Sequence, residues 1–197
     1  MIDLRSDTVT RPTPEMRRAM ATAELGDDVY GEDPTVNRLQ ELAAEMLGKE
    51  EALLVSSGTQ GNQVSILTHC SPGSEVILEE EAHIFNYEAG AAAALAGVQL
   101  HTLKGERGIP TPAQFSDAIR EENVHFPPAA LFCLENTHNR AGGAIIPLEK
   151  MEAVFQLARS RSIPVHLDGA RLFNAAVATG VPVHCYAAAC DSVQICL

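Results

Sequence analysis

The segment Val-His-Leu-Asp-Gly-Ala-Arg at residues 165–171 combines an imidazole, a carboxylate and a guanidinium within one short stretch. If the segment begins as a strand, alternation of the side chains puts His166 and Asp168 on one face. A carboxylate at the end of a strand could hold a protonated ring nitrogen, Gly169 would let a ligand approach closely, and Arg171 adds a fixed positive charge. Asp168 could equally be the cap of a following helix.

Small and polar residues at 56–62, Ser-Ser-Gly-Thr-Gln-Gly-Asn, precede an apolar helical pattern. Free backbone N–H groups at the start of a helix, where its dipole is positive, can bind an anion such as phosphate. Gly58 and Thr59 lie at this turn. The segment is neither a GxGxxG fingerprint nor a P-loop, and an ordinary Ser or Thr cap would also explain it.

Two further polar segments follow apolar runs. His83, in Glu-Ala-His-Ile-Phe at 81–85, lies at a predicted strand-to-helix junction. It could stack on a flat ligand or move protons, or it could be a surface or capping histidine. Residues 135–140, Glu-Asn-Thr-His-Asn-Arg, are dense in polar side chains. A turn stabilised by Asn and Thr side chains explains this density nearly as well as a binding loop does.

Short apolar runs alternate with amphipathic segments along the chain. The predicted strands are Ala52–Ser56, Glu75–Leu78, Val98–Leu103, Ala130–Glu135, Ile163–Asp168 and Ser192–Leu197. The predicted helices are Pro34–Leu47, a short one after Pro112 that includes Ser116–Ile119, Leu148–Arg159, and an Ala-rich helix after His83. This alternation indicates an α/β fold of three layers, with a mostly parallel sheet covered by helices on both faces.

In such a sheet, ligands bind beyond the carboxyl ends of the strands. The polar segments described above each follow a different predicted strand, so we expect them to meet at that edge. Together they offer an anion-binding turn, a candidate for ring stacking, an acid for a ring nitrogen and an arginine. This set suits a flat, phosphorylated, pyridine-like cofactor, for which pyridoxal phosphate is the natural candidate.

The composition is that of an acidic globular protein. Of 197 residues, 46% are hydrophobic, and 14 Lys+Arg against 26 Asp+Glu give a formal net charge of −12. This charge argues against a nucleic-acid binder and against binding to an anionic membrane. We expect no membrane span, because no stretch reaches the ~20 apolar residues required, and no signal peptide. Five cysteines without a CxxC pair favour reduced thiols in a cytoplasmic protein, with no metal site.

Long motifs follow one another in a fixed order along the chain. They are Asp-Leu-Arg-Ser-Asp-Thr-Val-Thr at 3–10, Gly-Asp-Asp-Val-Tyr-Gly-Glu-Asp-Pro at 26–34, Ser-Gly-Thr-Gln-Gly-Asn-Gln at 57–63, Glu-Asn-Thr-His-Asn at 135–139 and His-Leu-Asp-Gly-Ala-Arg at 166–171. In these motifs the chain resembles the threonine aldolases, pyridoxal-phosphate enzymes of the aspartate-aminotransferase fold type, over essentially its whole length. The resemblance implies that residues 1–20 form an N-terminal arm or helix contributing to the site. Residues 21–197 would then be most of a cofactor-binding large domain.

The resemblance also implies roles for the residues that bind the cofactor. The backbone of Gly58 and Thr59 would bind its phosphate, in agreement with the anion-binding turn. His83 would stack on the pyridine ring. Asp168 would pair with the ring nitrogen and keep it protonated, so that the ring withdraws electrons.

A second set of roles concerns the amino-acid substrate. By the resemblance, Ser6 and Arg171 would hold the substrate near its carboxylate, and Tyr30 would line the site from a neighbouring subunit. Tyr87 and His125 match positions that contact the substrate side chain. His83 is the first candidate for the catalytic base and His125 is the second.

Chemistry of this class needs a lysine amine to hold the cofactor. The chain has three lysines, Lys49, Lys104 and Lys150, and none is predicted at the end of a strand facing the site. The resemblance places the cofactor lysine two residues beyond Leu197, in a Ser-Lys pair. We therefore expect Leu197 to be a truncation point, followed in the whole protein by a smaller C-terminal domain.

The implied activity is retro-aldol cleavage of threonine or allo-threonine to glycine and acetaldehyde. The implied assembly is at least a homodimer, and we expect a homotetramer. Three other interpretations remain open. One is a β-eliminating lyase of the same fold type. Another is an inactive fragment or pseudo-enzyme that serves as a binding module. A nicotinamide oxidoreductase is the third, and the absence of a glycine-rich fingerprint disfavours it.

Overall fold

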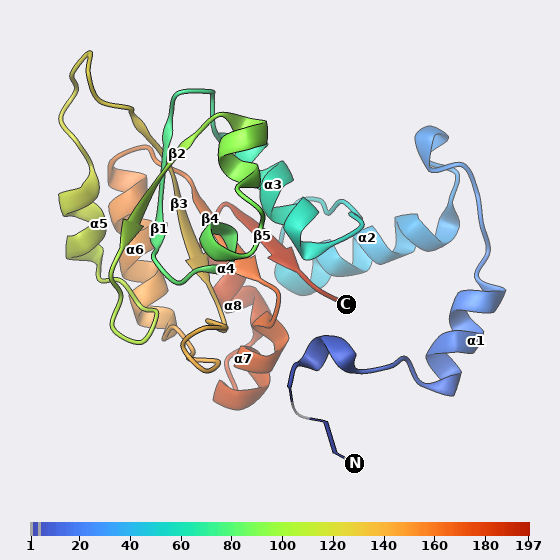
Figure 1. Cartoon of the computed structure of the whole chain (residues 1–197). Helices are drawn as coiled ribbons and strands as arrows, with labels where there is room; N and C mark the ends of the chain where they lie inside the picture. Colours follow the sequence, from blue (N-terminus) through green and yellow to red (C-terminus); the bar gives the residue numbers. More distant parts are fainter. Residues whose placement is uncertain (1, 4) are drawn as a thin grey trace.

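The computed structural model describes residues 2–3 and 5–197, and a parallel sheet of five strands lies at its centre (Figure 1). The strands are β1 (Glu75–Glu79), β2 (Gln99–Leu103), β3 (Ala129–Glu135), β4 (Val165–Gly169) and β5 (Ser192–Ile195). Their order across the sheet is β2-β1-β3-β4-β5, and each neighbouring pair is parallel. The predicted α/β fold with a parallel sheet is confirmed.

Helices and short turns connect and cover the strands. The α-helices are α1 (Pro14–Thr22), α2 (Pro34–Leu47), α3 (Gly58–His69), α4 (His83–Asn86), α5 (Pro112–Ala118), α6 (Leu148–Ser160), α7 (Leu172–Thr179) and α8 (Val183–Ala188). The 3₁₀ turns are η1 (Asp7–Val9) and η2 (Asp28–Tyr30), and η3 (Ala92–Ala96) is a π-helical turn. Among the described residues, no helix combines the length and the hydropathy that crossing a membrane requires.

Alternating side chains give the sheet two separate cores. On one face, residues of α5, α6, α7 and α8 pack on buried strand residues such as Phe132, Val165 and Leu167. The Phe115 and Phe132 rings lie 4.6 Å apart there. On the other face, Ile66 of α3 and the alanines of η3 pack on β1 and β3. Buried apolar side chains on both faces explain why these strands read as near-continuous apolar runs.

Helix α2 spans the residues predicted for it, and local signals fix both of its ends. The Asp33 side chain caps the helix, since its Oδ1 accepts from the backbone N–H groups of Thr35 and Val36 at 3.0 and 2.9 Å. Gly48 ends it in the left-handed conformation, with φ of 63°. Helices α5 and α6 and the five predicted strands from residue 75 onward are confirmed with small shifts at their ends.

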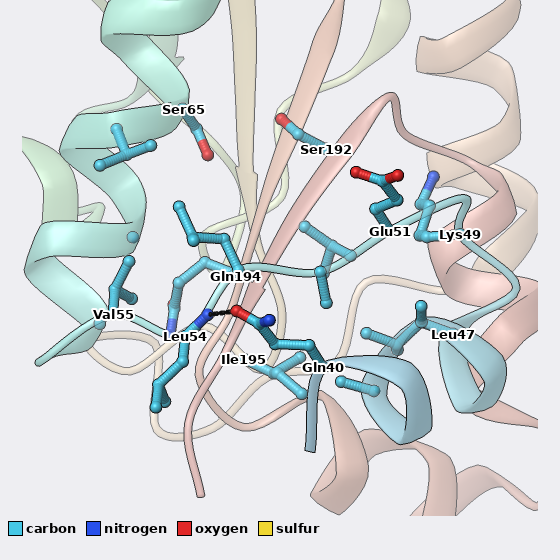
Figure 2. A pocket seen from close by; sticks show the side chains of 18 of the residues that line it. Gln40, Leu47, Lys49, Glu51, Leu54, Val55, Ser65, Ser192, Gln194 and Ile195 are labelled. Atoms are coloured by element: carbon cyan, nitrogen blue, oxygen red, sulfur yellow. Dashed lines mark hydrogen bonds between the residues drawn. The ribbon is translucent and has the colours of Figure 1, made fainter. Parts of the chain in front are cut away.

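The predicted strand Ala52–Ser56 is wrong, because these residues join no strand of the sheet. Side chains take their backbone N–H groups instead: Leu54 N donates to Gln40 Oε1 at 2.9 Å and Ser56 N to Gln60 Oε1 at 2.7 Å. A cavity of about 520 Å³ lies between this segment, β5, α2 and α3 (Figure 2). The apolar run thus lies beside the sheet without the ladder that a strand requires.

The predicted Ala-rich helix after His83 is also interrupted. The short helix α4 ends at Asn86, and Ala89 and Gly90 then have positive φ angles of 52° and 70°, which no regular helix contains. A π-helical turn, η3, then takes the place of the expected regular helix. Its end at Gly97, with φ of 64°, is again left-handed.

The N-terminal part of the chain, drawn in blue in Figure 1, extends away from the sheet. Its larger apolar side chains are exposed; they include Met16, Met20, Leu25, Val29 and Tyr30. Near the start, the Asp7 carboxylate accepts from Arg171, the residue that precedes α7. A division into an arm at 1–20 and a domain at 21–197 stays a prediction.

Candidate active site

The carboxyl ends of β3, β4 and β5 bring three polar residues into one row. In the register of the sheet, Glu135 pairs with Asp168, and Asp168 pairs with Gln194. Asp168 is buried, and its carboxylate accepts from Asn62 Nδ2 at 2.8 Å and from the Ala170 backbone N–H at 3.1 Å. No cation pairs with it among the described side chains.

The Asp168 carboxylate is therefore a buried acid that forms no ion pair with the described side chains. Burial, and secondly the charge of Glu135, raise the pKa of Asp168 from 3.8 to about 6. A cationic group placed against this carboxylate would reverse the shift, because an opposite charge favours the ionised form. A site of this kind can hold a protonated ring nitrogen.

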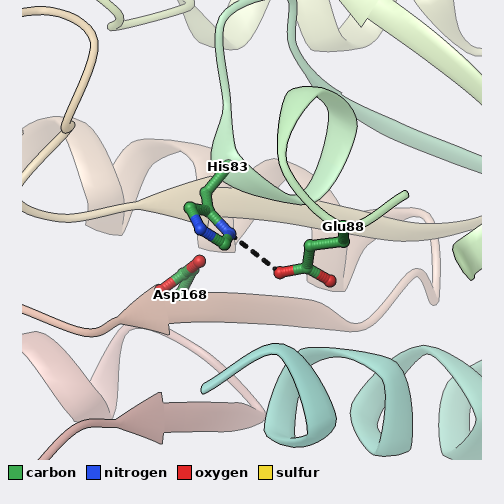
Figure 3. Close-up of side chains that lie close together, drawn as sticks. All are labelled: His83, Glu88 and Asp168. Carbon is green, nitrogen blue, oxygen red and sulfur yellow. Dashed lines mark hydrogen bonds and ion pairs between the residues drawn. The ribbon is translucent and has the colours of Figure 1, made fainter. Parts of the chain in front are cut away.

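His83, at the start of α4, lies beside Asp168 (Figure 3). Its Nδ1 is bonded to Glu88 Oε1 at 3.0 Å, and its backbone N–H donates to Glu135 Oε2 at 2.6 Å. Atoms of His83, Glu88 and Asp168 lie within 4.8 Å of one another. The hydrogen bond that His83 Nδ1 donates to Glu88 raises the pKa of His83 and leaves Nε2 as the ring nitrogen able to face a ligand.

The turn at residues 57–61 is both a helix cap and a potential anion site. Ser57 Oγ accepts from Gln60 N at 3.1 Å, so the ordinary capping interpretation is confirmed. Gly58 and Thr59 are the first two residues of α3, whose N–H groups find no acceptor within a helix. At Gly61 an added Cβ would lie 2.6 Å from Gln194 Cγ, so this glycine lets α3 approach β5 closely.

Arg171 follows β4 and lies near the same edge. Its Nη2 donates to Asp7 Oδ1 at 2.7 Å, and this pairing raises the pKa of Arg171 and lowers that of Asp7. Ser6, next to Asp7, caps η1 by accepting from Thr8 N at 3.2 Å. The predicted substrate-binding residues Ser6 and Arg171 are thus joined through Asp7, although they are 165 positions apart.

Tyr87 ends α4, and its ring lies 5.5 Å from the His83 ring. Its hydroxyl accepts from Arg140 Nη1 at 2.9 Å, and Arg140 also donates to Glu81 Oε2 at 2.7 Å. Arg140 belongs to the polar segment 135–140. That segment is held as a turn, since His138 N donates to Ala144 O and Asn139 N to Glu135 Oε1.

Two predicted site residues lie elsewhere in this chain. His125 is in the loop before β3, where Pro128 O accepts from the N–H of Glu75 at the start of β1. This loop is at the amino ends of the strands, opposite to Asp168. Tyr30 is 78% exposed in η2, within the part that extends away from the sheet.

The lysines also lie away from the buried carboxylate, as the sequence predicts. Lys49 Nζ donates to Cys190 O at 2.6 Å, just before β5 begins. Lys104 is exposed after the edge strand β2, and Lys150 is exposed in the first turn of α6.

Sequence reasoning missed two residues of this site. Glu88 is buried and binds His83, Asn62 and Gln63 through its carboxylate. Asn62 belongs to the polar turn at 56–62, where the sequence gives no sign that its amide reaches Asp168. The sequence held one signal for Glu88, a single glutamate beside an Ala-rich run. A charged residue in an apolar segment that becomes buried must have polar partners, so it marks a polar cluster.

Comparison with known proteins fits this geometry. The sequence profile of the family described as beta-eliminating lyase matches residues 3–197. The chain belongs to the beta-eliminating lyase family. Within curated proteins, it is 50% identical over 200 residues to low-specificity L-threonine aldolase 1 of Arabidopsis thaliana, covering all of this chain and 56% of that protein. It is 45% identical to the low specificity L-threonine aldolase of Escherichia coli K12, covering all of this chain and 59% of that protein.

Solved structures related to this beta-eliminating lyase family member have the same fold. The threonine aldolase of Leishmania major superposes with a TM-score of 0.79 at 25% identity, over 92% of this chain and 53% of that one. An L-allo-threonine aldolase homologue from Listeria monocytogenes gives a TM-score of 0.78 over 91% of this chain and 49% of that one. The chain thus spans about half the length of the relatives it matches.

Proposed function

We propose that the protein formed by this chain is a pyridoxal-phosphate-dependent aldehyde-lyase that cleaves threonine or allo-threonine to glycine and acetaldehyde. The observation that carries the proposal is Asp168, a buried carboxylate at the carboxyl edge of the sheet that forms no ion pair within the described part of the chain. The names of the related L-threonine aldolases support the substrate class. The reaction would serve threonine breakdown and glycine formation.

The residues present fit this cofactor. Asp168 offers an anion for a protonated pyridine nitrogen, and the first N–H groups of α3, at Gly58 and Thr59, offer donors for a phosphate. His83 lies next to Asp168, where it can cover one face of a ring. When bound, pyridoxal phosphate would supply an electron sink for the Cα–Cβ bond that breaks.

Chain residues would then bind and orient the amino acid. Arg171 would bind the substrate carboxylate, which would replace Asp7 as its anionic partner, and Ser6 lies next to that pair. Orientation of the substrate decides which of its bonds breaks. His83 is our first candidate for the group that takes the proton from the β-hydroxyl, through Nε2, because Glu88 occupies Nδ1. Tyr87, beside His83, would contact the substrate side chain.

We further propose that the protein forms at least a homodimer and that the complete assembly is a homotetramer. The exposed apolar side chains of the N-terminal part, such as Leu25, Val29 and Tyr30, support this, because such groups mark association surfaces when they gather. In an assembly, Tyr30 and His125 could reach the site of a neighbouring subunit. His125 then remains our second candidate for the base. Five free cysteines fit a cytoplasmic location.

The deciding experiment measures products. The protein loaded with pyridoxal phosphate is incubated with threonine and allo-threonine, and acetaldehyde and glycine are quantified. Separate incubations with serine and cysteine test for pyruvate, the product of β-elimination. We expect acetaldehyde in equal amount to glycine and only traces of pyruvate. Pyruvate as the main product would assign the alternative, β-eliminating activity, and no product with any of them would favour the inactive binding module.

A further inference from the structure

Asn62 lies at the centre of a buried hydrogen-bond network between α3 and the sheet. Its side chain is 1% exposed. Its amide nitrogen donates to Asp168 Oδ2 at 2.8 Å and to Glu88 Oε1 at 2.7 Å, which uses both of its hydrogens. Its Oδ1 is 3.0 Å from His166 Nε2. Every hydrogen-bonding group of this amide is therefore engaged.

The chemistry of the partners fixes the direction of each bond. Reversing the Asn62 amide would place its oxygen against two carboxylate oxygens, so the nitrogen must face them. Burial lowers the pKa of His166 to about 3, so its ring is neutral and carries one proton. Because Asn62 Oδ1 only accepts, that proton is on His166 Nε2. His166 Nδ1 then accepts from Ser192 Oγ, and Ser192 Oγ accepts from His69 Nε2, both at 2.9 Å.

In this series of hydrogen bonds, every donor thus points away from His69 and toward the two carboxylates. Asp168 and Glu88 have different tasks: Glu88 binds the His83 ring, whereas Asp168 has no hydrogen-bonded side chain other than Asn62 among residues 2–3 and 5–197. Their oxygens lie within 4.8 Å of each other and of the His83 ring nitrogen. Two carboxylates at that distance repel each other unless donors lie between them. The Asn62 amide is the group that lies between them.

We propose that Asn62 is a positioning residue, which holds the Asp168 carboxylate ready for the cofactor nitrogen and, through Glu88, holds the His83 ring beside it. Neutral His166 and Ser192 fix the orientation of the Asn62 amide. The role toward the cofactor rests on the proposed function. The role toward Glu88 and His83 depends only on the network itself. Gln63 is a useful contrast, since its Nε2 donates to Glu88 but makes no bond to Asp168.

The first test replaces the amide. In Asn62→Ala both carboxylates lose a donor, and the protonated form of Asp168 becomes more favourable. We expect the dissociation constant of pyridoxal phosphate, measured by calorimetry, to rise at least tenfold and its pH dependence to move to higher pH. Asn62→Ser keeps one hydroxyl donor, which can serve one carboxylate but not both, and should give an intermediate change. It also provides a test if Asn62→Ala does not fold.

The matched control is Thr68→Ala on the same helix, because Thr68 is exposed and bonds only to the Val64 carbonyl. Circular dichroism and urea unfolding establish that each variant is folded. The Thr68→Ala protein should bind pyridoxal phosphate like the wild type. Wild-type affinity and an unchanged pH dependence in folded Asn62→Ala would overturn the positioning role toward the cofactor.

A second readout does not need the cofactor. The anionic groups that face His83 are Glu88, Asp168 and Glu135. Without Asn62, the Glu88 carboxylate loses a competing donor and its hydrogen bond with His83, the largest influence on the pKa of that ring, becomes stronger, so the His83 titration seen by NMR of ¹⁵N-labelled histidine should move to higher pH. His166 in the wild type should show the neutral form protonated at Nε2. If the wild type binds no pyridoxal phosphate, the proposed function fails, and an unmoved His83 titration would separately overturn the positioning role.

Discussion

The face of the sheet beneath α6 is apolar on β3, β4 and β5, whereas the face beneath α3 is apolar on β1 and becomes polar on β4 and β5. On the first face, Phe132, Val165 and Leu167 are fully buried among other apolar groups. On the second, the apolar packing around Ile66 gives way to His166 and Asp168 and their hydrogen-bond partners. Both faces belong to the same strands, so the difference arises from alternate positions of β4 and β5.

This contrast separates what stabilises the fold from what prepares the site. Burial of apolar surface is favourable without any partner, but a buried polar group is costly unless it is hydrogen-bonded. The polar face meets that condition only in part: Gln63 Oε1 and Gln194 Oε1 are buried there without a partner among the described residues. Asp168 likewise has no counter-charge. We therefore expect substitutions on the polar face to affect ligand binding first, and substitutions on the apolar face to affect stability first.

The largest effect on binding is expected for Asp168→Ala. Removing one partner of a buried ion pair costs about 3–5 kcal/mol, which corresponds to a loss of roughly two to four powers of ten. Pyridoxal phosphate affinity and threonine cleavage should both fall by that factor. The free energy of unfolding without cofactor should not fall, because the variant lacks the uncompensated charge. Calorimetry, an acetaldehyde assay and urea unfolding measure the three quantities, and wild-type cleavage would contradict the role of Asp168.

The counterpart on the apolar face is Phe132→Ala. Phe132 is fully buried and its ring packs on Phe115. Truncating a buried Phe costs about 3–5 kcal/mol through lost transfer energy and the cavity left behind. Urea unfolding should show this loss, while the folded fraction should bind pyridoxal phosphate with near wild-type affinity. A large loss of affinity in the folded fraction would show that the two faces are not independent.

A smaller effect, of about 3 kcal/mol, is expected from pH acting on Asp168. The carboxyl ionises near 3.8 in the unfolded chain and near 6 in the folded one. As the pH rises through this window, the unfolded state releases a proton that the folded state retains, so the free energy of unfolding falls. At pH values above this window, Asp168 is ionised in both states and the loss of unfolding free energy stays constant. Urea unfolding across this range should show the fall in the wild type and a flatter profile in Asp168→Asn; identical profiles would refute the shift.

The sequence predicted the apolar face well, because its signals are local. Periodic apolar residues and the Asp33 and Gly48 ends identify α2, and the alternation in Val165–Gly169 identifies the side of the strand that carries Asp168. Ala52–Ser56 has the same apolar character as a strand. Composition could not show that Gln40 and Gln60 bind its backbone, since those contacts depend on how α2 and α3 pack.

The site was predictable where a side chain follows a strand and less so where it arrives from a helix. Asp168 and His83 follow from the rule on strand ends, whereas the turn at Gly58 follows Ala52–Ser56, which joins no strand of the sheet. Glu88 reaches the same place from the irregular segment between α4 and η3, where the sequence predicts a regular Ala-rich helix. His125 precedes a strand instead of following one, and the fold of this single chain leaves it at the opposite edge.

The smallest effect on stability is expected for Asp7→Asn, which removes the partner of Arg171 at the rim of the polar face. Asp7 is half exposed, and exposed ion pairs contribute about 0.2–1 kcal/mol, screened further by salt. The free energy of unfolding should fall by no more than that, and added salt should have less influence on it than in the wild type. Threonine binding should respond differently, since the substrate carboxylate would no longer have to replace an anion on Arg171. We expect the KM for threonine to decrease severalfold with kcat little changed. An increased KM would instead mean that Asp7 orients Arg171 for the substrate.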